Sequence, residues 1–166
     1  EVGLPAGVLQ FVPGGGSEVG NLLVEHPQIR FINFTGSMEV GKGIYEKAGK
    51  TGEGQIWLKR VIAEMGGKDF MFIDEDADVD KAVQHSYAAA FGFQGQKCSA
   101  LSPLILHESI HDEFMDKFLP LVEATTIGHP SEQKNFLAAM INESAMNDAI
   151  KGIEEAKKAG NTLVAG

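Results

Sequence analysis

Short apolar segments alternate with helical segments along this chain, and that alternation limits the folds it can adopt. Residues 30–35 form a predicted strand, and the turn at Gly36 and Ser37 leads into a predicted helix over residues 38–48. Residues 57–64 are apolar enough near their end for a second strand. Strands that alternate with helices are typical of a parallel sheet covered by helices. The expected fold class is therefore α/β.

Apolar spacing, helix caps and chain breakers predict the remaining elements. Ser17 and Ser109 are each predicted to cap a helix, and Pro103 marks its strand as an edge strand or an irregular one. The last predicted strand ends with the chain, as expected of a truncated sequence. In order, the predictions are strand 8–12, helix 17–26, strand 70–73, helix 79–91, strand 101–106, helix 109–123, a helix capped by Asn142 or Ser144 that ends at 159, and strand 162–165.

Composition and charge exclude several classes of function. The net charge is −9 and the basic residues form no run longer than a pair, whereas a phosphate-binding face needs clustered Lys and Arg. Nucleic acid is therefore not an expected partner. No window reaches the roughly 18 apolar residues of a membrane span, and no charged-then-apolar leader precedes the first strand. A cytoplasmic location without a membrane partner is expected, and the single cysteine excludes an internal disulfide framework.

Glycine makes up 20 of the 166 residues, and it is clustered rather than scattered. Clusters of this kind mark places where the backbone turns sharply or approaches a ligand closely. The clusters lie at residues 14–16, 36–43, 49–54, 66–67 and 92–95.

The cluster at residues 36–43 nearly spells a phosphate-binding P-loop between a strand and a helix. The last position fails, because Gly43 has no hydroxyl to hold Mg²⁺ where the motif needs Ser or Thr. A weaker interpretation remains, since a glycine turn at a helix N-terminus is a good seat for a phosphate. A plain tight turn is the other interpretation of the same residues.

Residues 107–111 spell His-Glu-Ser-Ile-His, the short motif of zinc peptidases. Those enzymes need both histidines on one face of one helix, with the glutamate as base. Here His107 directly follows a predicted strand and Ser109 is the predicted helix cap, so the histidines are expected to straddle a junction. The predicted elements therefore argue against the alternative of a zinc metallopeptidase built on His107, Glu108 and His111, and no metal is expected.

The strongest chemical signal is a cysteine and a carboxylate, each beside glycines. Cys98 follows a helix that Gly92 and its neighbours break, which favours exposure over packing, and Lys97 beside it favours the thiolate. Glu64 ends a predicted strand ahead of Gly66 and Gly67, where a substrate could approach. Together they suggest a cysteine nucleophile and a carboxylate base, although their spacing alone does not pair them.

At these residues the sequence resembles the aldehyde dehydrogenase superfamily. The matches are residues 34–37 with Gly41, residues 64–68 and residues 95–98, in the family's order and spacing. Residues 54–64 and 96–100 are similar to one group of that family, the Δ1-pyrroline-5-carboxylate (glutamate γ-semialdehyde) dehydrogenases. Leu101 and Pro103 depart from the small residue and Arg expected there.

The resemblance implies an NAD-dependent oxidation of an aldehyde to an acid, here glutamate γ-semialdehyde to glutamate in proline breakdown. Cys98 would be the nucleophile and Glu64 the base that activates water, with the Cys98 N–H as half of an oxyanion hole. It also implies NAD contacts and a substrate contact: Gly36, Ser37 and Gly41 at the pyrophosphate, Val40 near the adenine, Met65 and Gly66 along the nicotinamide, and Ser99 toward the aldehyde.

The resemblance further implies a partial aldehyde dehydrogenase fold. Residues 1–66 would be the C-terminal part of a Rossmann-like NAD-binding domain, and residues 67–166 the N-terminal part of the catalytic domain. The family's oxyanion-hole asparagine and ribose-binding residues would lie outside this segment, so the isolated chain is expected to be inactive or nearly so. Full-length family members are homo-oligomers. A non-catalytic α/β binding or assembly module is the alternative of another class.

Overall fold

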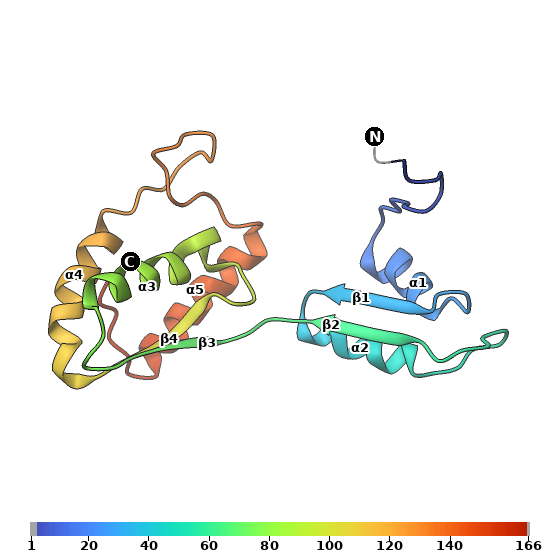
Figure 1. Ribbon diagram of the computed structural model, residues 1–166, viewed down its shortest axis with the longest axis horizontal. Coiled ribbons are helices and arrows are strands. Elements are labelled where there is room, and N and C mark those ends of the chain that lie inside the picture. Colours follow the sequence, from blue (N-terminus) through green and yellow to red (C-terminus); the bar gives the residue numbers. More distant parts are fainter. Residues whose placement is uncertain (1–2, 166) are drawn as a thin grey trace. The chain divides into compact units, whose positions relative to one another are not determined.

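The computed structural model describes residues 3–165, and the chain divides into two compact units, Glu1–Gly66 and Gly67–Gly166 (Figure 1). Each unit is built around two parallel strands with helices packed on them. The α/β class predicted from the alternating pattern is therefore correct for both units. Among the described residues, no helix is long and apolar enough to cross a membrane.

The first unit pairs two strands that lie far apart in sequence. Strand β1 (Phe31–Thr35) runs parallel to β2 (Arg60–Glu64), with Thr35 opposite Glu64. Helix α2 (Met38–Ala48) packs against β2, and α1 (Asn21–Glu25), which follows a π-turn over Gly16–Gly20, packs against α2. One face of the strand pair is half-buried, while Phe31 and Ile62 lie exposed on the other.

The second unit has the larger core. Strand β3 (Asp69–Ile73) pairs in parallel with β4 (Leu101–Leu106), and α3 (Val79–Phe91) packs against α4 (His111–Glu123). Two short 3-10 turns, η2 (Gly92–Gly95) and η3 (Glu108–Ile110), precede β4 and α4. Helix α5 (Glu143–Lys158) follows an irregular stretch. The buried centre of this unit consists of Ile73, Val83, Ile110 and Phe114.

Several local predictions are confirmed. The strand register shifts between Asp69 and Met71 opposite the segment that contains Pro103, so β4 is the irregular strand that the proline indicated. The helix predicted after the turn at Gly36 and Ser37 begins at Met38, and the Ser37 side chain accepts from the Val40 N–H at 3.3 Å. Asn142, rather than Ser144, caps α5 by accepting from the Ala145 N–H at 2.8 Å.

Other local predictions are wrong. Residues 8–12 and 162–165 form no strand, because the described part of the chain offers neither segment a neighbour to pair with. Ser17 lies inside the π-turn and caps nothing, since Gly15 occupies the cap position. Ser109 is not a cap either, because the His107 side chain takes that position and accepts from the Ser109 N–H.

Candidate active site

The carboxyl ends of β1 and β2 bring two of the sequence motifs together in the first unit. Because the strands are parallel, both end at the same edge of the pair. The Gly36 N–H donates to the Glu64 carbonyl oxygen at 3.0 Å, just beyond the last paired residues. The glycine turn that starts α2 therefore lies directly beside residues 64–66, and the carboxylate of Glu64 is exposed there.

Gly41 allows helix α2 to approach this edge closely. A Cβ at Gly41 would lie 2.8 Å from the Met65 sulfur and 3.5 Å from the Phe34 ring, so a side chain there would push Met65 aside. The Gly41 N–H itself donates to the Ser37 carbonyl oxygen at 2.9 Å. The N–H groups of Met38 and Glu39 have no carbonyl partner within the helix, because they belong to its first turn.

A groove of about 400 Å³ runs along the same helix. It lies between α2 and the segment that contains the π-turn and α1, and the exposed Val40 forms part of its wall. The groove is mainly apolar, and Glu39 and Lys47 are the charged residues in its lining. Its lining is Gly16, Ser17, Asn21, Glu39, Val40, Gly43, Ile44 and Lys47.

In the second unit, Cys98 lies on a tightly bent segment between α3 and β4. Helix α3 ends at Phe91, and Phe93, Gln94 and Gly95 then take left-handed backbone conformations with φ of 54°, 57° and 67°. A turn follows in which the Ala100 N–H donates to the Lys97 carbonyl oxygen at 3.1 Å. Cys98 and Ser99 occupy the central positions of this turn, and both are exposed.

Gly67 lies against the backbone of Cys98. A Cβ at Gly67 would come within 2.6 Å of the Cys98 carbonyl oxygen, a distance that real side chains do not reach. Gly66, in contrast, has open space where a Cβ would stand. The sequence marked the Gly66–Gly67 pair as the end of a strand, an open approach for a substrate and a domain boundary, and the contact of Gly67 with the cysteine turn was missed.

The two histidines of the peptidase-like motif lie on different elements. His107 precedes η3 and its Nδ1 is 2.8 Å from the Ser109 hydroxyl, whereas His111 opens α4 with its Nδ1 2.9 Å from Asp112. A zinc peptidase requires both histidines on one face of one helix, and His107 and His111 do not meet that requirement. Within residues 3–165 no three His, Cys, Asp or Glu side chains gather around a common point.

The P-loop interpretation also fails on geometry. Helix α2 begins at Met38, so Gly41, Lys42 and Gly43 lie inside a helix rather than in a loop that could wrap a phosphate. The helix N-terminus remains available to an anion, with its first-turn N–H groups directed outward from the helix end.

Comparison with known proteins adds independent information. The sequence model of the aldehyde dehydrogenase family matches residues 1–166. A 1-pyrroline-5-carboxylate dehydrogenase of Geobacillus sp. (strain WCH70) is 50% identical over the whole chain, which covers 32% of that relative. The chain thus spans about a third of the length of the curated relatives that it matches.

Solved structures agree with the sequence matches. The structure of a 1-pyrroline-5-carboxylate dehydrogenase from Thermus with bound NAD has a TM-score of 0.88 and 46% identity, covering 94% of this chain and 30% of its own. Proline utilization A from Bdellovibrio bacteriovorus has a TM-score of 0.90 and 40% identity, covering 94% of this chain and 16% of its own.

Proposed function

The chain belongs to the aldehyde dehydrogenase family, and we propose that it carries the nucleophile, the base and part of the NAD site of an enzyme that oxidises glutamate γ-semialdehyde to glutamate. The observation that carries the proposal is the shared edge of β1 and β2, where Gly36 is hydrogen-bonded to the backbone of Glu64. The names of the relatives support the choice of substrate.

We assign the first unit to the end of the NAD-binding domain and the second to the start of the catalytic domain. The fit of NAD is supported by two features of the first unit. One is the mainly apolar groove of about 400 Å³ beside Val40, for the adenine, and the other is the N-terminus of α2, where the N–H groups of Met38 and Glu39 have no helical carbonyl partner and could face the pyrophosphate. Met65 and Gly66 would lie along the nicotinamide. Bound NAD would supply the acceptor for the hydride that leaves the substrate carbon.

The chain's own residues would act in sequence around one carbon atom. The Cys98 thiolate adds to the aldehyde carbon, and the backbone N–H of Cys98 donates to the oxygen as it becomes negative. After hydride leaves, Cys98 holds the acyl group as a thioester. Glu64 takes a proton from water, the resulting hydroxide attacks the thioester, and the acid and the thiolate are released. Ser99, next to the nucleophile, would contact the substrate.

The test is a chimera, because the segment spans only about a third of its relatives. The 166 residues would replace the matching segment of the Thermus 1-pyrroline-5-carboxylate dehydrogenase, and reduced-nicotinamide absorbance would be followed with NAD and glutamate γ-semialdehyde. We expect turnover by the chimera, none with Cys98→Ala, and a loss of about 10²–10⁴-fold with Glu64→Gln.

The isolated chain, assayed beside its own Cys98→Ala variant, should show no turnover. A folded chimera that binds NAD but is unaffected by Cys98→Ala would contradict the assignment of the nucleophile. A chimera that oxidises other aldehydes but not the semialdehyde would contradict only the substrate.

A further inference from the structure

We propose that Gln96 is a positioning residue that fixes the backbone turn bearing Cys98, by tying it to residues 136–141, termed here the anchor segment. The inference rests on the proposed function only for the identity of Cys98 as the nucleophile. Gln96 would touch neither substrate nor cofactor in this role, and it would act through the geometry of the turn.

The turn before Cys98 needs outside support. Phe93 and Gln94 both have positive φ, at 54° and 57°, a conformation that side chains other than glycine disfavour. Two such residues in succession persist only where surrounding contacts hold them.

Two glutamine side chains bridge the turn to the anchor segment. Gln96 accepts from the Ile141 N–H at 3.0 Å through Oε1, and its Nε2 donates to the Phe93 carbonyl oxygen at 3.4 Å. Gln94, with its amide oriented to satisfy both neighbours, accepts from the Ala138 N–H at 2.6 Å and donates to the Phe93 carbonyl oxygen at 2.9 Å. The strained residues are therefore held on two sides.

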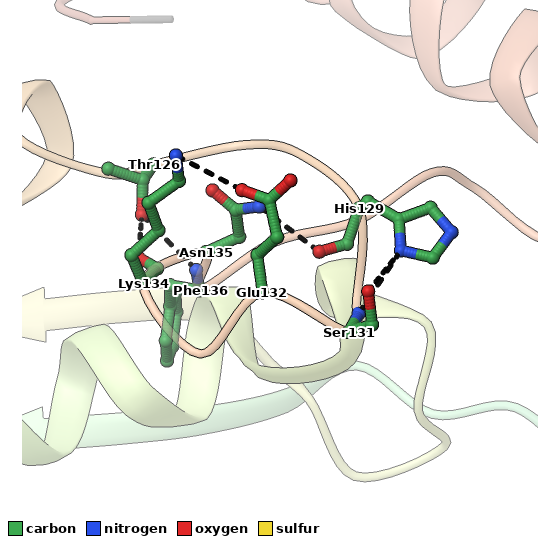
Figure 2. Close-up of polar contacts among 7 residues, drawn as sticks. All are labelled: Thr126, His129, Ser131, Glu132, Lys134, Asn135 and Phe136. Atoms are coloured by element: carbon green, nitrogen blue, oxygen red, sulfur yellow. Dashed lines mark hydrogen bonds and ion pairs between the residues drawn. The ribbon is translucent and has the colours of Figure 1, made fainter.

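The anchor segment is itself fixed by a closed surface loop, residues 126–136 (Figure 2). The Thr126 carbonyl oxygen accepts from the N–H groups of Phe136 and Leu137 at 3.1 and 3.0 Å, which joins the two ends of the loop. The Asn135 side chain donates across the loop to the His129 carbonyl oxygen at 3.1 Å. These hydrogen bonds fix the start of the anchor segment, directly before the residues that the glutamines contact.

The aromatic stack beneath the loop connects it to helix α3. The Phe136 ring stacks on Tyr87 with centroids 5.0 Å apart, and the Tyr87 hydroxyl is 2.7 Å from the Thr125 hydroxyl. Helix α3 leads directly into the bent turn, and its Tyr87 also contacts the loop that holds the anchor segment. The turn and the anchor segment are therefore both connected to the same helix. Gln96, two residues before the nucleophile, adds a direct hydrogen bond between the turn and the anchor segment.

Hydrogen exchange measured by mass spectrometry on the whole chain tests the proposal. Gln96→Leu should raise exchange roughly fivefold in residues 92–99 and 138–142, the gain expected for losing one such hydrogen bond, and leave β4 and α4 unchanged. Gln96→Glu keeps an acceptor oxygen for the Ile141 N–H and should restore most of the protection. Gln84→Leu, on the exposed surface of α3, is the matched control.

A second readout follows the nucleophile itself. Cys98 is the only cysteine, so a trifluoromethyl label reports on it alone by ¹⁹F NMR. One narrow line is expected in the parent chain and in Gln84→Leu, and a line moved toward the shift of an unstructured peptide in Gln96→Leu. Gln96→Glu should return the line toward its original position.

Unchanged exchange and an unchanged line in Gln96→Leu would overturn the proposal, as would faster exchange spread evenly over residues 67–165. If Gln96→Leu does not fold, Ile141→Pro removes the donor N–H from the other side and should produce the same local effect. A Cys98 that resists labelling in the parent chain would count against the proposed function, while the exchange data would still decide the role of Gln96.

Discussion

Gly67 is the residue whose replacement the structure tolerates least near the nucleophile. A Cβ at Gly67 would meet the Cys98 carbonyl oxygen at 2.6 Å, and a backbone atom cannot swing away as a side chain can. We therefore expect Gly67→Ala to lower the free energy of unfolding by about 1–3 kcal/mol. Urea titration followed by circular dichroism would measure the change.

The neighbouring glycine provides the control for that prediction. Gly66→Ala adds the same methyl group where nothing lies within 4 Å, and its unfolding midpoint should match that of the parent chain. Equal unfolding midpoints for the two variants would show that the backbone at Cys98 can move away from the added methyl group without a loss of stability, and would contradict the prediction.

Single residues show how far the sequence alone could reach. The exposure of Cys98 was correctly predicted, because a broken helix just ahead of it is a local feature. The contact of Gly67 with Cys98 and the bridge from Gln96 to Ile141 could not be predicted. They join residues 31 and 45 positions apart, and only the folded chain brings them together.

At the scale of elements, the helix caps provide a pH-dependent contribution to stability. Asp78 caps α3 by accepting from the Lys81 N–H at 3.1 Å, and its carboxylate lies 2.8 Å from the Lys81 ammonium. The hydrogen bond from the Lys81 side chain is the main cause that holds the pKa of Asp78 below its ordinary value of 3.8. A carboxyl with a lowered pKa stabilises the fold above its unfolded pKa, and this stabilisation is lost as the pH falls through the folded pKa.

Asp78→Asn removes the negative charge but keeps the helix cap, because asparagine caps helices about as well as aspartate. The variant should melt at a slightly lower temperature than the parent chain near neutral pH. As the pH falls below the ordinary carboxyl pKa of 3.8 and through the lowered pKa of Asp78, the parent chain should lose this advantage, so that the two melting temperatures converge. Thermal melts across that range are the measurement, and a constant difference at every pH would contradict the role of the Asp78 charge.

Elements were predictable where their signals are local. Helices α2 and α3 span the residues predicted for them, Met38–Ala48 and Val79–Phe91, and a glycine follows each helix directly. Strands depend on a partner elsewhere in the chain, and the predictions at residues 8–12 and 162–165 failed for that reason. Composition cannot reveal whether a partner exists.

At the scale of the whole molecule, each strand pair leaves large apolar side chains exposed on one face, which is unusual for an α/β protein. Parallel sheets are normally covered on both faces, yet Phe31 and Ile62 on one strand pair and Phe70 and Phe72 on the other are about half or more exposed. The curated relatives are about three times as long as this segment. Stability should therefore depend on the few side chains that are buried, and very little on the apolar side chains of the open faces.

Two phenylalanines of the second unit test this distribution. Phe114 is fully buried in the core with Ile73, Val83 and Ile110, so Phe114→Ala should destabilise the chain by about 3–5 kcal/mol, the usual range for a large side chain removed from a packed core. Phe70 is 68% exposed on β3, so Phe70→Ala should change the free energy of unfolding by no more than about 0.5 kcal/mol.

The dye 1-anilinonaphthalene-8-sulfonate, which binds exposed apolar surface, distinguishes the two variants further. Phe70→Ala removes part of an open face and should lower dye fluorescence, whereas Phe114→Ala loosens the core and should raise it. Urea titration and dye binding on the same samples provide both readouts. A large loss of stability from Phe70→Ala would mean that the isolated chain covers the face of β3 with its own residues, and the open face of the β3–β4 pair would not exist in solution.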